Sequence, residues 1–218
     1  MHHLLSAFLI FSLLIQNPAN SSQAGSSQAN KPVTLAQVWT LDATYHDAAH
    51  GVSFRYPSAW MATTDFAYHA PALKDSFAKP IAGFAYDGGF SNRRLAGPYS
   101  STNLEGFGIV YSAVKAESAA KCYKMAASLA DSPKHSTVVL GGRSFREFET
   151  GEDGMSQSIS GSLYASYAKH TCYLFETDLA LASEAVLDDV DGLTTAQLKY
   201  IFDHLDGIMK TVEIAPGK

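Results

Sequence analysis

Apolar and polar residues alternate along several stretches of the chain, and this pattern predicts β-strands. In Gly51–Trp60, the side chains of Val52, Phe54 and Tyr56 share one side of an extended strand. Pro57 ends that strand, because proline removes a backbone donor from the ladder. By the same alternation, strands are predicted at 45–47, 81–86, 107–115, 137–140, 143–150, 158–167 and 171–178. Most of them follow one another through short turns, so we expect a mostly antiparallel sheet.

Two segments repeat apolar residues at helical spacing instead. Residues 117–131 place Cys122, Met125, Ala126 and Leu129 on one stripe. Near the C-terminus, Thr194 and Gln197 form a capping box. It is followed by a longer stripe of Leu198, Ile201, Phe202, Leu205, Ile208 and Met209. Two helices, at about 117–131 and 194–210, therefore pack on the sheet, and we predict an α+β fold of the α/β/α sandwich type.

The stretch Gly51–Trp60 also resembles a known family. Its order of glycine, aromatic strand, tyrosine-proline and tryptophan is similar to the start of PsbP-like (Mog/PsbP-type) domains, which are small α/β/α modules. The resemblance covers roughly Tyr45 to Ile214 and implies a binding or assembly protein. Because the matching motif is a folding motif, no functional residue follows from it.

The first residues have the features of an export signal. Leu4–Ile15 is almost wholly apolar but too short to span a bilayer as a folded helix, and Asn17-Pro18 ends it. Small residues predict cleavage after Ala24, or else after Ala19. An uncleaved anchor is the alternative interpretation.

These features divide the chain into three predicted parts. Residues 1–24 are the signal peptide. Residues 25–44 are a flexible tether, since Gly25–Lys31 is polar and has no apolar period. Residues 45–214 are a single domain, which we expect in the periplasm or outside the cell.

The charge balance narrows the class of partner. The formal net charge is −5, and no basic cluster exceeds Arg93-Arg94. Nucleic-acid binding is therefore not expected, because it requires a surface that neutralises phosphates. Stable insertion into a membrane after signal cleavage is not expected either. The partner that remains is another exported protein or a small ligand.

The chain has two cysteines, Cys122 and Cys172. An exported chain with an even number of cysteines is a candidate for a disulfide. Cys122 lies on the apolar stripe of the first helix, and Cys172 shares a strand face with Leu174. We predict a bond between helix and sheet, with two buried free thiols as the alternative.

Motifs for catalysis are weak. The sequence contains no P-loop, no dinucleotide fingerprint and no complete nucleophile elbow, and no cofactor is predicted. His46, Asp47 and His50 form a candidate metal site, because two imidazoles and a carboxylate lie at a predicted hairpin turn. The alternative is a pair of solvated turn histidines.

The segment Asp87–Gly106 is long, rich in glycine and serine, and predicted as a binding loop with Arg93, Arg94 and Tyr99 as contact residues. A hairpin tip without function is the alternative. Taken together, these features predict an exported, non-catalytic binding or assembly module. The rival hypothesis is a small exported hydrolase or metal-dependent enzyme that uses His46, Asp47 and His50.

Overall fold

The computed structural model describes residues 33–63, 70, 72–73, 78–88, 97–183 and 190–215. The chain divides into two compact units, residues 1–31 and 32–218, and every described residue belongs to the second. The predicted signal peptide and both candidate cleavage sites lie outside the described residues. Within the described part of the chain, no helix has the length and apolar character needed to cross a membrane.

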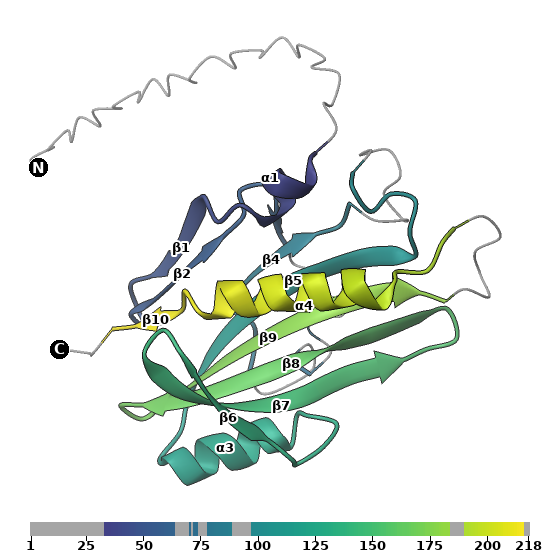
Figure 1. Ribbon diagram of the computed structural model, residues 1–218. Coiled ribbons are helices and arrows are strands. Elements are labelled where there is room, and N and C mark those ends of the chain that lie inside the picture. Colours follow the sequence, from purple (N-terminus) through teal and green to yellow (C-terminus); the bar gives the residue numbers. More distant parts are fainter. Residues whose placement is uncertain are drawn as a thin grey trace, which may run out of the picture. The chain divides into compact units, whose positions relative to one another are not determined.

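The strands of the described residues form two sheets (Figure 1). The large sheet has seven strands in the order β3-β4-β5-β9-β8-β7-β6, and all neighbours are antiparallel. Its strands are β3 (Met61–Ala62), β4 (Ala82–Tyr86), β5 (Leu104–Lys115), β6 (Ser136–Leu140), β7 (Arg143–Asp153), β8 (Gln157–Ala168) and β9 (Thr171–Ala182). The small sheet contains β1 (Ala43–Asp47), β2 (Val52–Tyr56) and β10 (Glu213–Ile214). The predicted strands are therefore present, with ends that differ by a few residues.

Helices cover both faces of the large sheet. The helices are α1 (Leu35–Trp39), α3 (Ala119–Ala127) and α4 (Thr195–Met209). On β9, Tyr173, Phe175 and Leu179 join one apolar cluster with the buried stripe of α4 and the small sheet. Cys172 and Leu174 alternate with them and join a second cluster with α3. The predicted α+β fold and both predicted helices are confirmed.

The predicted tether is wrong in its C-terminal part. Residues 35–39 form α1, in which Val38 and Trp39 are buried. Thr34 and Gln37 form a capping box at its start, the same device that begins α4. This helix is too short for a helical stripe to be recognised in the sequence, and it is ordered because Trp39 stacks on Phe107 of β5 at 4.5 Å between ring centroids.

The predicted disulfide is confirmed. Cys122 of α3 is bonded to Cys172 of β9, with 5.2 Å between their α-carbons, and both residues are completely buried. The bond joins the helix to the central part of the sheet and closes a loop of 50 residues. A crosslink of this kind stabilises a fold mainly because it restricts the unfolded chain.

We expect reduction of this bond to lower the free energy of unfolding by about 4 kcal/mol, the chain-entropy value for a loop of this length. Thermal or urea unfolding of the parent protein, with and without reductant, measures the difference. The double variant Cys122→Ala, Cys172→Ala is the control, because its stability should not respond to reductant. Equal stability of the reduced and oxidised parent would contradict the prediction.

Candidate functional site

The predicted metal site does not converge. Asp47 and His50 meet at the β1–β2 turn, where the His50 Nδ1 lies 2.7 Å from Asp47 Oδ2. The backbone N–H groups of Ala49 and His50 donate to Asp47 Oδ1, so this carboxylate caps the turn. His46 precedes Asp47 on β1 and is exposed, while Asp47 is half-buried, because successive strand residues point to opposite faces. Among the described residues, no group of three His, Cys, Asp or Glu side chains could hold a metal ion.

The pKa of Asp47 reflects this role in the turn. Burial raises it, but the hydrogen bonds from the side chain and backbone of His50 outweigh burial, so the pKa lies below its usual value. The carboxylate is therefore charged at neutral pH and holds the hairpin. In this geometry the Asp47 carboxylate stabilises the β1–β2 turn.

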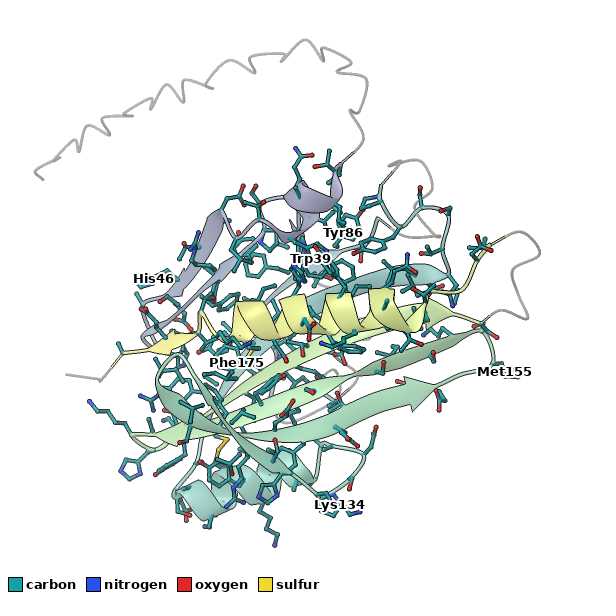
Figure 2. All side chains as sticks on the ribbon, in the orientation of Figure 1. Trp39, His46, Tyr86, Lys134, Met155 and Phe175 are labelled. Atoms are coloured by element: carbon teal, nitrogen blue, oxygen red, sulfur yellow. A yellow bond between two sulfur atoms is a disulfide. The ribbon has the colours of Figure 1, made fainter. Side chains whose placement is uncertain are left out.

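The structure describes one of the three contact residues predicted in the loop Asp87–Gly106. Arg93 and Arg94 lie outside the described residues. Tyr99 is not the exposed aromatic residue that we expected, since only 3% of its surface is accessible. Its hydroxyl accepts a hydrogen bond from the Trp39 indole N–H at 3.1 Å, and its ring packs edge-on against Phe107. Tyr99 belongs to the core because α1 covers this end of the sheet, near the Trp39 and Tyr86 labels of Figure 2.

A buried carboxyl pair on β9 was not predicted from the sequence. Glu176 and Asp178 share a face of the strand and are 0% and 1% exposed. The backbone N–H groups of Ala72 and Leu73 donate to Glu176 at 2.9 and 3.0 Å. Neither carboxyl forms an ion pair with a basic side chain among the described residues. The pattern that could have revealed the pair is Glu-Thr-Asp inside an otherwise apolar strand.

Gly161 makes room for the Asp178 side chain. Asp178 lies between Gly108 of β5 and Gly161 of β8 in the sheet register. A Cβ at position 161 would lie 2.1 Å from Asp178 Oδ1, so any side chain there would displace the carboxyl group. Thr150, next to Gly161 across β7 and β8, is placed to donate its hydroxyl to the same oxygen at 3.4 Å. The site is built around the acid and is closed to solvent.

The pKa values of both carboxyl groups are raised, which favours a protonated form of the pair. Burial raises the pKa of Glu176 to about 7, although the two backbone donors lower it. Burial and the neighbouring Glu176 raise the pKa of Asp178 well above its usual value. Oδ2 of Asp178 is buried and has no hydrogen-bond partner among the described residues, which favours the protonated form of this carboxyl group. Both side chains are buried, so this pair offers no access to a substrate.

A second feature lies at the surface, on the edge strand β6. This strand reads Ser-Thr-Val-Val-Leu and contains no charged residue. It is the last strand of the large sheet, and Val139 is 69% exposed. Proteins usually protect such an edge with charges, proline or a bulge, because its unpaired backbone groups can pair with another strand. None of these protections is present within β6.

The hairpin geometry fixes which groups of β6 face outward. Gly141 and Gly142 both have positive φ, so β6 and β7 are joined by a two-residue turn. Leu140 and Arg143 then form a hydrogen-bonded pair, and the next pair, Val139 with Ser144, does not. In agreement, the Ser144 carbonyl faces β8, where it accepts from the Ser166 hydroxyl at 3.0 Å. The N–H and C=O groups of Val139, and by the same alternation those of Thr137, therefore point away from the sheet.

The β6–β7 hairpin contacts the segment that follows helix α4. A Cβ at position 141 would lie 1.9 Å from the Val212 carbonyl oxygen, so the turn can approach this segment only because residue 141 is glycine. Arg143 donates to the Ile214 carbonyl at 3.2 Å. These contacts join the β6–β7 turn to the segment that follows α4.

No protein-family model matches the chain, and no curated protein matches it. Solved structures with a similar fold include a Bacteroides thetaiotaomicron protein, with 11% identity and a TM-score of 0.43 over 81% of this chain and 49% of that one. The chain thus spans about half the length of that protein. LpqN, involved in cell envelope biogenesis of Mycobacterium tuberculosis, has 13% identity and a TM-score of 0.43 over 85% and 90%. The Saccharomyces cerevisiae Ran-binding protein Mog1p has 10% identity and a TM-score of 0.43 over 79% and 94%. This likeness concerns the fold alone.

The carboxyl pair predicts a pH-dependent stability. Because the folded-state pKa of Glu176 is raised from 4.5 to about 7, its contribution is fully present below pH 4.5 and is lost as the pH rises through 7. We expect the free energy of unfolding to fall by about 3 kcal/mol over this window, at 1.36 kcal/mol per pKa unit. Urea unfolding between pH 5 and 8 measures it.

The matched variants are Glu176→Gln and Glu213→Gln. The first removes one of the two buried acids and should reduce the fall of the free energy of unfolding with pH, while the part that Asp178 contributes remains. The second replaces an exposed carboxyl group on β10 and should keep the slope of the parent. An equal slope in the parent and Glu176→Gln would show that Glu176 does not titrate in this range.

Proposed function

We propose that this protein is a non-catalytic binding or assembly module that acts in the periplasm or outside the cell. The observation that carries the proposal is the open edge of β6, where the backbone groups of Thr137 and Val139 face outward beside an exposed valine. Such an edge binds an extended segment by strand addition, in which main-chain hydrogen bonds provide the affinity. The partner thereby becomes a further strand of the large sheet.

The Cys122–Cys172 bond supports the compartment. Disulfides of this structural type persist in oxidising environments and are rare in the cytosol. The apolar signal-like segment Leu4–Ile15 agrees with export. Together they support a site of action in the periplasm or outside the cell.

The rival function, a hydrolase or metal-dependent enzyme at His46, Asp47 and His50, has no observation in its favour. His46 lies on the opposite face of β1 from Asp47, and the Asp47 carboxylate is already bonded to His50 and to two backbone N–H groups. A binding role therefore accounts better for the surface that is present.

Val139→Pro tests the proposal. Proline removes the outward N–H of residue 139 and leaves the bonds between β6 and β7, because that N–H does not belong to their ladder. Val139→Thr is the control, since it keeps the backbone donor and a β-branched side chain. In a pull-down from the exported fraction, we expect the amount of partner bound by Val139→Pro to be at least about tenfold lower than the amount bound by the parent, which corresponds to 1.4 kcal/mol of binding free energy. Val139→Thr should bind about as much partner as the parent.

Thermal unfolding shows whether the proline variant is folded. If it is not, Thr137→Lys with Val139→Lys provides a second way to block the edge, because exposed lysine residues protect edge strands without a cost in the core. A partner that both blocked variants retain at the level of the parent would contradict a role for β6. A parent protein that retains no specific partner would contradict the binding function itself.

A further inference from the structure

A hollow of about 700 Å³ lies where the small sheet meets the turn between β6 and β7. Figure 1 shows β10 and this turn beside the turn between β1 and β2. Small residues contribute much of the lining and take up little of the space, namely Ala48, Gly51, Gly141, Gly142 and Ala215. A volume of this size is typical of sites that bind small molecules.

Three polar side chains form a row across the small sheet and line this hollow. Ser53 of β2 pairs with His46 of β1 on one side and with Glu213 of β10 on the other. Direct cross-strand partners place their side chains on the same face of a sheet. This is the outer face, because His46 and Glu213 are exposed. The strand alternation that separates His46 from Asp47 therefore places His46 in this row.

Arg143 adds a positive charge to the lining of the hollow. It is the first residue after the β6–β7 turn, and it donates a hydrogen bond to the Ile214 carbonyl at 3.2 Å. A guanidinium group has five N–H donors, so this bond leaves others available to a ligand.

The opposite charges of Arg143 and Glu213 do not pair with each other. Among the described residues, neither of them forms an ion pair. Arg55 and Lys210 line a neighbouring hollow that shares Ser53 and Glu213 with this one, but in the described part of the chain neither is ion-paired with Glu213. The hollow therefore presents one basic and one acidic group that a ligand can reach.

We infer that this hollow binds a small zwitterion, a molecule that contains both a carboxylate and an ammonium group. The Arg143 guanidinium can hold a carboxylate through two parallel hydrogen bonds, and the Glu213 carboxylate attracts the ammonium group. The Ser53 hydroxyl and the His46 imidazole provide further hydrogen-bonding groups in the same row. A simple anion would be repelled by Glu213 and a simple cation by Arg143. This small-molecule site is separate from the strand addition proposed at β6.

Glycine, diglycine and triglycine test the inference, because they carry the same two charges at increasing separation. Isothermal titration calorimetry at low ionic strength measures their affinity for the parent protein. For the zwitterion that binds most tightly, the N-acetyl form and the C-terminal amide each remove one charge. We expect each blocked form to bind about fivefold more weakly, the upper end of what an exposed ion pair provides. This preference should shrink in high salt, because exposed charges are screened.

Variants assign each charge of the ligand to its partner. Glu213→Gln should bind the zwitterion about as weakly as the parent binds the N-acetyl form, and its affinity for the N-acetyl form should not fall. Arg143→Gln should show the same relation to the amide. Glu149→Gln is the control, since Glu149 is an exposed acid of β7 outside this hollow, and it should keep the affinity of the parent. If thermal unfolding shows that Arg143→Gln is not folded, Glu213→Gln with the N-acetyl probe decides.

Each contrary result overturns a stated part of the inference. If none of the three zwitterions binds the parent, or if the blocked forms bind as tightly as the zwitterion, the hollow is not a zwitterion site. A preference that the amide loses but the N-acetyl form keeps, unchanged in Glu213→Gln, would make the ligand a simple anion. An equal loss of affinity in Glu149→Gln would show that net charge, and not this hollow, sets the binding. Failure here leaves strand addition at β6 intact, because Val139→Pro tests that function separately.

Discussion

Burial of strand β9 on both of its faces is the constraint on which the rest of the structure depends. β9 lies between β5 and β8, and its side chains alternate between two apolar clusters. A sheet that is apolar on both faces must be covered on both faces. Helix α4 with the small sheet covers one, and α3 covers the other, where the Cys122–Cys172 bond fixes it to β9.

The same strand contains the most costly groups in the core. A buried carboxyl group without a cation is unfavourable unless it is protonated or hydrogen-bonded. For Glu176 the backbone donors of Ala72 and Leu73 meet this requirement, and for Asp178 a raised pKa favours the protonated form, with Gly161 leaving room for the side chain. The same bonds hold Ala72 and Leu73 against the sheet. Protonation of Glu176 therefore affects the contacts of these two residues with this face of the sheet.

The two ends of the large sheet differ in how they are protected. At one end β3 is only two residues long, and a short edge offers few backbone groups to another chain. At the other end β6 is longer, uncharged and partly exposed, and the glycine turn at 141–142 holds it in place. An edge of this kind offers unpaired backbone groups to an extended segment, which is the physical basis of the proposed binding role at β6.

Local patterns in the sequence predicted most of the elements. The alternation of Val52, Phe54 and Tyr56 defined β2, the capping box of Thr194 and Gln197 with its stripe defined α4, and the facing positions of Cys122 and Cys172 predicted their bond. These predictions succeeded because each depends on a periodicity or spacing within a few residues. The five residues of α1 gave no such pattern, since the helix is held by the contact of Trp39 with Phe107, a residue far away in the sequence.

For the candidate sites, the sequence determined which residues could carry chemistry, and tertiary structure decided where they lie. His46, Asp47 and His50 are close in sequence, yet strand alternation turns His46 away from the other two. Tyr99 is buried because Trp39 and Phe107 pack around it. The sequence determined that residues 136–140 form a strand. That this strand ends the sheet, with the backbone groups of Thr137 and Val139 facing outward, was decided by long-range pairing, because a strand's own residues do not specify whether another strand lies beside it.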